Sequence, residues 1–241
     1  MLPELLRTLL CLGLLAGGIL MGAHLSHASD RDARLRYLAL GDSYTIGESV
    51  PMADRWPMQL AARLRDDGIA FADPEILATT GWTTDELSAA MDAHHFTPPY
   101  DLVSLAIGVN NQYRGRDIDN YAKELDALLS RAVGLAGGHT ERVFMLSIPD
   151  WGVTRFGQES GRDRGQIAAR LDAFNARAAR LCERHGVAFV DIMPVSRALG
   201  ANADMMAADG LHPSGALYAE WAALALPVVR DLIRETPGTG N

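Results

Sequence analysis

The chain consists of short apolar runs that alternate with longer segments of helical periodicity. Four runs are clear, at residues 37–40, 102–107, 143–148 and 187–192, and residues 76–78 form a weaker fifth. Continuous apolarity, as opposed to alternation, is typical of strands covered on both faces, as in a parallel sheet. Helical patterns occupy residues 56–64, 84–91, 118–136, 166–184 and 214–233. We therefore expect right-handed crossovers and an α/β fold, a doubly wound three-layer α/β/α domain.

Length and composition support one globular domain whose partner is not a nucleic acid. The chain has 241 residues, of which 48% are hydrophobic and 22% charged, enough for one sizeable core. Its formal net charge is −8 and it contains no basic run. Such a surface is a poor match for a phosphate backbone, so we expect no nucleic-acid partner. No repeat or linker divides residues 29–241, which we expect to form a single domain.

The first 28 residues have the pattern of an export signal. The amino terminus and Arg7 give a thin positive region before an apolar stretch at residues 8–23, and Ser26 and Ala28 place small side chains at a cleavage site. We expect a periplasmic or secreted protein that begins near Ser29 and has no stable membrane insertion after cleavage. An uncleaved membrane anchor is the alternative. Cleavage would leave Cys182 as the sole cysteine and exclude an internal disulfide.

Glycine-rich and polar segments follow the expected strands. They read Gly41-Asp42-Ser43, Thr80-Gly81-Trp82, Gly108-Val109-Asn110-Asn111 and Pro149-Asp150-Trp151-Gly152. In an open parallel sheet the loops after the strands lie along one edge, where ligands bind. We therefore expect these segments to contribute to a single site although they are far apart in sequence.

Ser43 and His212 together indicate nucleophilic catalysis. A serine hydroxyl is a weak nucleophile until a base removes its proton. His212 follows Asp209 by three residues, a spacing that provides a base with an orienting carboxylate. We expect Ser43 to attack a carbonyl carbon while His212 accepts the proton and Asp209 holds the imidazole. The structural alternative is that Ser43 only caps a turn.

Acyl transfer also needs donors for the oxyanion of its tetrahedral intermediate. The candidates are the backbone N–H groups of Ser43 and Gly81 and the side-chain amide of Asn110. Asn110 also fits a simple turn, and Gly81 also fits a backbone angle that other residues avoid. Both structural roles are compatible with donation.

The motifs, in this order, resemble those of the SGNH hydrolases, also called the GDSL esterase/lipase family. The resemblance rests on Gly41-Asp42-Ser43, Gly81, Gly108-Val109-Asn110-Asn111 and Asp209-Gly210-Leu211-His212-Pro213, and covers nearly the whole mature chain. It implies Ser43 as nucleophile, Gly81 and Asn110 as oxyanion donors, and Asp209 with His212 as the rest of a triad. It also implies a flavodoxin-like five-stranded parallel sheet of order 2-1-3-4-5. Many members have aspartate where this chain has Asn111, which leaves the support of that loop in question.

Aromatic residues after the strand ends are candidates for substrate binding. We expect Trp82, Tyr113 and Trp151 to line the pocket, although each is equally suited to packing the loop beneath it. Residues 151–165 form a long polar segment, which we expect to be a binding loop that sets substrate choice.

Metal and cofactor motifs are missing from the sequence. It has no His-Glu-x-x-His, no Cys-x-x-Cys and no Walker-type glycine-rich loop. His94 and His95 fit solvated residues near a helix end, and Cys182 fits a packed thiol on an apolar helix face. We expect neither a metal nor a cofactor.

These features predict an exported serine esterase that acts on small carboxylic esters, including acetyl esters on carbohydrate. The substrate would be a small-molecule, glycan or lipid ester. A lysophospholipase, a thioesterase, an arylesterase or an acyltransferase would use the same residues, and the sequence leaves these alternatives open. A non-catalytic carbohydrate- or lipid-binding protein is disfavoured because Ser43, Asp209 and His212 are all present.

Overall fold

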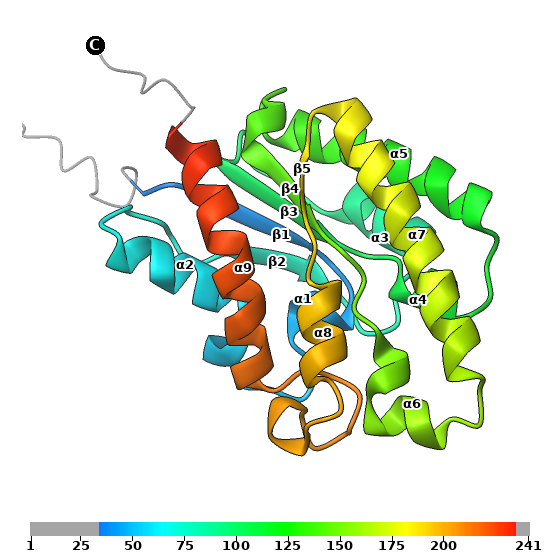
Figure 1. Cartoon of the computed structure of the whole chain (residues 1–241). Helices are drawn as coiled ribbons and strands as arrows, with labels where there is room; N and C mark the ends of the chain where they lie inside the picture. The colour runs from blue at the N-terminus through cyan, green and yellow to red at the C-terminus, as the bar shows by residue number, and fades with distance from the viewer. Residues whose placement is uncertain (1–33, 235–241) are drawn as a thin grey trace, which may run out of the picture. The chain divides into compact units, whose positions relative to one another are not determined.

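The computed structural model describes residues 34–234, so the expected signal segment lies outside the described residues. A five-stranded parallel sheet forms the centre of the described part of the chain (Figure 1). Its strands are β1 (Tyr37–Gly41), β2 (Glu75–Ala78), β3 (Leu102–Ala106), β4 (Val143–Leu146) and β5 (Ala188–Val190). Their order is β2-β1-β3-β4-β5, which confirms the expected doubly wound α/β fold.

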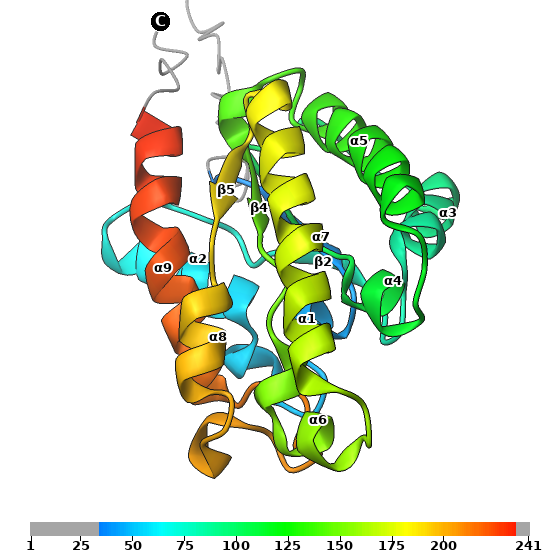
Figure 2. The same ribbon diagram turned by 45° about the vertical axis from the view of Figure 1, so that its right-hand side comes forward.

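Helices cover both faces of this sheet (Figure 2). One layer contains α2 (Trp56–Asp66), α8 (Met193–Leu199) and α9 (Gly215–Arg234). The other contains α3 (Thr84–Ala93), α5 (Ile118–Leu135) and α7 (Arg164–His185). The five long helices predicted from periodicity are all present, with ends that differ by at most two residues.

Short helices fill the connections, where the sequence showed no periodicity. They are α1 (Ser43–Ile46), α4 (Val109–Tyr113), α6 (Arg155–Glu159) and the 3₁₀ turns η1 (Met52–Asp54), η2 (Thr140–Arg142), η3 (Trp151–Val153) and η4 (Ala203–Met205). The segment 151–165, which we expect to be a binding loop, contains η3 and α6. Thr154 caps α6 by accepting a hydrogen bond from the backbone N–H of Gly157 at 3.1 Å.

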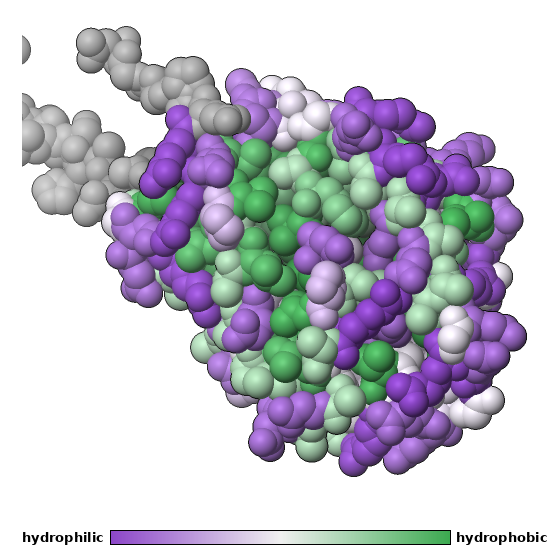
Figure 3. Space-filling view, viewed as in Figure 1, coloured by the Kyte–Doolittle hydropathy of each residue, from purple (hydrophilic) through white to green (hydrophobic). Residues whose placement is uncertain are grey.

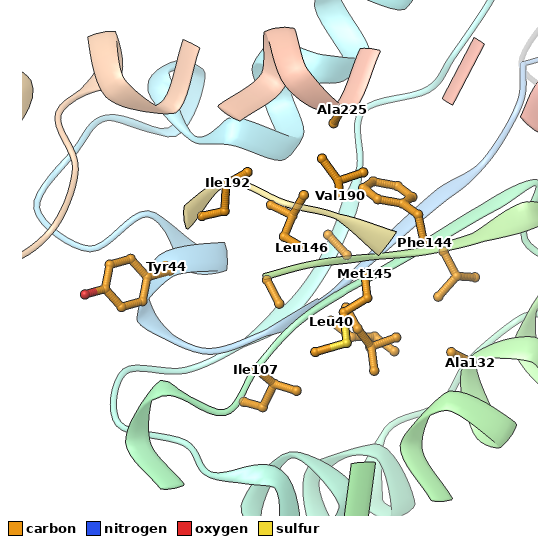
Figure 4. Packing of buried hydrophobic residues seen from close by; sticks show 14 of the residues in the cluster. Leu40, Tyr44, Ile107, Ala132, Phe144, Met145, Leu146, Val190, Ile192 and Ala225 are labelled. Carbon is orange, nitrogen blue, oxygen red and sulfur yellow. The ribbon is translucent and has the colours of Figure 1, made fainter. Parts of the chain in front are cut away.

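The core lies on both sides of the sheet (Figure 4). Along β4, Phe144 and Leu146 point toward α9, whereas Met145 points to the opposite face, as the two-residue period of a strand requires. All three side chains are fully buried. Burial on both faces explains why the central strands read as continuous apolar runs.

The edge strand β5 is short and only partly covered. Apolar side chains gather between α9 and α7, where β5 lies, with polar side chains on either side (Figure 3). A three-residue edge strand offers little backbone for pairing with another chain. No helix within residues 34–234 is long and apolar enough to cross a bilayer.

The carboxyl ends of β1, β3 and β4 lead into α1, α4 and η3, which lie at the same end of the sheet (Figure 1). Gly41, the last residue of β1, is required there by close packing. A Cβ atom at this position would come within 2.5 Å of the Ala106 carbonyl oxygen in β3. The glycine thus allows β1 to pass directly into the turn that carries Ser43.

Candidate active site

Ser43 is the first residue of α1 and is 5% exposed. Asp42 caps this helix, because its Oδ1 accepts a hydrogen bond from the backbone N–H of Tyr44 at 3.0 Å. The N–H of Ser43 belongs to the first turn, where backbone donors have no partner within the helix. Ser43 thus places a hydroxyl and a backbone N–H at the carboxyl edge of the sheet.

Asp42 itself is 1% exposed. Burial raises the pKa of its carboxyl group to about 7, although the hydrogen bond from Tyr44 acts in the opposite direction. This side chain therefore supports the turn and does not face solvent.

Asp209 and His212 are joined by a hydrogen bond of 2.7 Å between Oδ2 and Nδ1. The carboxylate also holds its own loop, because Oδ1 accepts from the backbone N–H groups of Leu211 at 2.8 Å and His212 at 2.9 Å. An ionised carboxylate only accepts, so Nδ1 carries the proton and Nε2 of the neutral ring is left as the acceptor. This is the tautomer that a general base requires.

Asp209 remains ionised at physiological pH. Partial burial alone raises its pKa, but hydrogen bonds from the backbone of His212 and Leu211, from the Ser49 hydroxyl and from the His212 ring outweigh that effect and bring the pKa to about 2. The carboxylate is therefore charged when the imidazole beside it acquires a proton.

Tyr44 connects the turn of the candidate nucleophile with the imidazole. Its ring lies 5.2 Å from the His212 ring and 5.9 Å from the Trp221 ring, measured between centroids. The Ser43 hydroxyl makes no hydrogen bond within the described part of the chain. Hydrogen bonds between catalytic groups commonly form only when substrate is bound, so this geometry is compatible with proton transfer.

Gly81 and Asn110 occupy neighbouring loops. Gly81 has φ of +88°, in the region that favours glycine, and a Cβ atom there would meet only the Arg114 guanidinium, at 3.6 Å. Asn110 donates one amide hydrogen to the Trp82 carbonyl at 2.9 Å. An amide group carries two donors, so the second remains for a ligand. The loop contacts therefore leave both residues able to act as donors.

Asn111 provides the support that was in question for this loop. It is fully buried, and its Oδ1 accepts from the Thr84 backbone N–H at 3.1 Å while its Nδ2 donates to the Thr84 hydroxyl at 2.6 Å. The Thr84 hydroxyl in turn donates to Glu124. An aspartate could accept from the backbone but could not donate to a hydroxyl that is already committed to Glu124. Asn111 can therefore bind both the backbone N–H and the hydroxyl group of Thr84.

The three aromatic candidates for substrate binding differ in exposure. Trp82 and Tyr113 are partly buried, whereas Trp151 is 1% exposed and donates its indole N–H to Gln112 at 2.8 Å. Tyr113 packs edge-on against Trp151 with centroids 5.2 Å apart. Trp151 presents almost no surface to a ligand here, so the structure disagrees with its expected direct contact. Its ring packs instead against the rings of Tyr113 in α4 and Phe156 in α6.

Arginines around the site are engaged with the protein. Arg114 pairs with Glu86 at 3.1 Å and donates to the Gly81 carbonyl at 2.6 Å. Arg162 lies over the Tyr113 ring, 4.1 Å from its centroid. Arg155 donates to the Ala208 carbonyl at 2.8 Å and thereby holds the loop that carries Asp209.

Two contacts at the site were not predicted from the sequence. Ser49 donates its hydroxyl to Oδ2 of Asp209 at 2.7 Å, and Arg155 supports the loop of that aspartate. Neither residue belongs to a motif. Their partners lie 160 and 53 positions away, so only the fold brings them together.

Other titratable residues singled out in the sequence have structural partners. His94 lies 2.8 Å from a Glu75 carboxylate oxygen, and Cys182 is buried, which raises the pKa of its thiol to about 12. Within residues 34–234 no cluster of three or more histidine, cysteine or acidic side chains could hold a metal ion.

Comparisons with known proteins agree with this fold. The model of the GDSL-like Lipase/Acylhydrolase family matches residues 39–220. Among solved structures, TesA shares 20% identity with a TM-score of 0.66, covering 82% of this chain and 99% of its own. Axe2, an acetylxylan esterase from Geobacillus stearothermophilus, shares 18% identity with a TM-score of 0.62, covering 81% of this chain and 94% of its own.

A lipase/acylhydrolase from Enterococcus faecalis shares 17% identity with a TM-score of 0.62, and the alignment covers 86% of this chain and all of the other. No match was found among curated protein sequences. At these low identities, the structural similarity shows a shared fold alone. Membership of the family rests instead on the sequence match over residues 39–220.

Proposed function

Since the chain belongs to the GDSL-like lipase/acylhydrolase family, we propose that it is an exported serine esterase that hydrolyses small carboxylic esters, such as acetyl esters on carbohydrate. The observation that carries the proposal is the Asp209–His212 pair, with its 2.7 Å hydrogen bond, packed against the residue that follows Ser43. A carboxylate–imidazole pair of this kind beside a serine at a strand end is suited to activating a hydroxyl group.

In the proposed reaction the Ser43 hydroxyl attacks the ester carbonyl carbon and His212 Nε2 takes its proton. The protonated imidazole then gives that proton to the departing alcohol, which leaves an acyl group on Ser43. Water attacks the acyl carbonyl with His212 again as base, and cleavage releases the carboxylic acid and restores the serine. The negatively charged Asp209 stabilises the imidazolium in both halves.

The oxyanion of each tetrahedral intermediate would accept hydrogen bonds from the backbone of Ser43 and Gly81 and from the free amide hydrogen of Asn110. Removal of one such donor typically lowers kcat by about a hundredfold to a thousandfold. Asn110→Ala should show this loss, while Asn111 keeps the loop in place through Thr84.

Acetyl esters are favoured as substrates by two observations. One fold neighbour is an acetylxylan esterase. Within residues 34–234 the large apolar side chains that are strongly exposed are limited to Met52 and Leu224, which argues against a broad apolar surface for a lipid interface. Lysophospholipase, thioesterase and acyltransferase activities would use the same residues and are distinguished by the substrate tests below.

The decisive test is hydrolysis of p-nitrophenyl esters of increasing acyl length by the wild type and by Ser43→Ala. We expect the acetyl ester to react fastest and the variant to lose activity, with Ser130→Ala as a control because Ser130 lies on the exposed surface of α5. Equal rates in wild type and Ser43→Ala would refute the nucleophile. Faster cleavage of long acyl chains would indicate a lysophospholipase, and acetyl transfer to an added sugar faster than hydrolysis would indicate a transferase.

Export is tested separately by cell fractionation and by mass spectrometry of the purified protein. Cleavage after Ala28 would give an amino terminus at Ser29 in the periplasmic or secreted fraction. An intact amino terminus in the membrane fraction would indicate the uncleaved anchor.

A further inference from the structure

Ser49 has a backbone conformation that serine normally avoids. Its φ is +66°, and among residues 34–234 it is the sole non-glycine residue with a positive φ. A side chain in this region costs stability, and such costs persist where the surrounding structure gains something from them. Ser49 is also exposed, so core packing does not explain the choice of residue.

The gain is a hydrogen bond to the carboxylate of Asp209. Oδ2 accepts from the Ser49 hydroxyl at 2.7 Å and from His212 Nδ1 at 2.7 Å, while Oδ1 accepts from two backbone N–H groups at 2.8 Å and 2.9 Å. A carboxylate has about four acceptor sites, and all four are therefore used. Ser49 supplies the one donor that comes from outside the Asp209–His212 loop.

We propose that Ser49 is a positioning residue of the esterase site, whose hydroxyl fixes the Asp209 carboxylate so that Oδ2 stays in line with Nδ1 of His212. This inference rests on the proposed function. Ser49 does not touch the reacting atoms in the scheme above; it acts through Asp209.

The position of Ser49 in the chain strengthens this role. It lies six residues after Ser43, in the turn that follows α1, and the backbone N–H groups of Gly47 and Glu48 both donate to the Ser43 carbonyl. The Ser49 hydroxyl therefore joins the segment of the nucleophile to the segment of the base, across 160 positions of sequence. Loss of this bond leaves the Asp209 loop held by its own backbone and by Arg155.

Substitutions at Ser49 separate a positioning role from a purely structural one. Ser49→Gly removes the hydroxyl and relieves the positive φ, whereas Ser49→Ala removes the hydroxyl and keeps the strained backbone. We expect kcat to fall roughly tenfold in both variants, since the lost bond is to a charged group, with KM little changed. The Tm of Ser49→Gly should exceed that of Ser49→Ala by roughly 2–4 °C.

Unlike the other two variants, Ser49→Thr keeps a hydroxyl group, but on a β-branched side chain that tolerates positive φ poorly. We expect Ser49→Thr to retain most of the wild-type kcat and to have a lower Tm than Ser49→Gly. Between these two variants, activity and stability would then change in opposite directions. If kcat instead follows Tm across the three variants, with Ser49→Gly as active as the wild type, the proposal is overturned.

A spectroscopic measurement tests the same contact without any substrate. The proton on His212 Nδ1 gives a downfield NMR resonance. Loss of the Ser49 hydroxyl should release the Asp209 carboxylate from its alignment, weaken the bond between Nδ1 and Oδ2, and move that resonance upfield in Ser49→Gly. Arg155→Ala is the matched control, because Arg155 holds the same loop through the Ala208 carbonyl and touches neither oxygen of Asp209. An unchanged resonance in Ser49→Gly would overturn the proposal.

The two proposals fail in different ways. A wild type that hydrolyses no ester removes the proposed function, and the NMR resonance then decides alone whether Ser49 controls the Asp209–His212 bond. A wild type that is active, with Ser43→Ala inactive and Ser49→Gly unchanged in both kcat and resonance, retains the esterase and removes the role of Ser49.

Discussion

Replacement of Asp42 by asparagine should stabilise the protein at alkaline pH and leave its stability nearly unchanged at acidic pH. The carboxyl group is 1% exposed, and burial raises its pKa from 3.8 to about 7. In the unfolded chain the same group ionises near its ordinary value. The folded protein therefore binds more protons than the unfolded chain between these two values, and its stability falls as the pH rises through that window.

The magnitude follows from the difference between the pKa of Asp42 in the folded protein and in the unfolded chain. A tenfold change in an ionisation constant corresponds to about 1.36 kcal/mol, so ionisation of Asp42 costs the wild type about 4 kcal/mol once the pH exceeds 7. Asparagine keeps an oxygen that accepts from the Tyr44 N–H and is equally good as a helix cap, but it has no proton to lose. The variant should lack this component of the pH dependence.

The assay is urea denaturation of the wild type and Asp42→Asn at several pH values between about 4 and 8.5, which bracket the window in which the buried carboxyl ionises. Other groups titrate alike in both proteins, so the difference in unfolding free energy isolates Asp42. We expect a difference near zero at the acidic end that grows to a few kcal/mol in favour of the variant at the alkaline end. A difference that is the same at both ends would refute the reasoning and show that the carboxyl group gains compensating hydrogen bonds when it ionises.

Two further substitutions test the packing of the site loops. Asn111→Asp should lower the unfolding free energy by about 1–3 kcal/mol, because it removes the donor to the Thr84 hydroxyl and buries a second carboxylate nearby; an unchanged denaturation midpoint would contradict this. Gly41→Ala should lower the unfolding free energy by about 3 kcal/mol or more, since its Cβ would collide with the Ala106 carbonyl. Thermal unfolding measures this loss, and an unchanged Tm would show that the structure tolerates the extra methyl group.

Much of the architecture was predictable because burial of a parallel sheet on both faces gives its strands a continuous apolar sequence. The runs at 37–40, 102–107 and 143–148 became β1, β3 and β4, and helix periodicity located the long helices. The short helices α1, α4 and α6 were missed because four or five residues cannot display a 3.6-residue period. They are also the elements that carry or adjoin Ser43, Asn110 and Arg155.

The hydrogen bond between Asp209 and His212 was predictable from a spacing of three residues, since local geometry alone keeps such side chains close. The burial of Trp151 was not, because the sequence around an aromatic residue does not reveal whether its ring faces a ligand or the protein interior. The role of Asn111 was likewise not predictable, because its hydrogen bond with Thr84 exists only where α4 packs beside the start of α3.

The sequence by itself determined the parallel α/β class, the long helices and the identity of the Ser43, Asp209 and His212 candidates, because each depends on local periodicity or on short motifs. The tertiary structure alone decided that Ser49 would reach Asp209 and that Arg155 would hold the loop beside it. Those contacts join segments that are far apart in the chain. They form because the fold brings these segments together at the edge of the sheet, and a local sequence pattern contains no information about that.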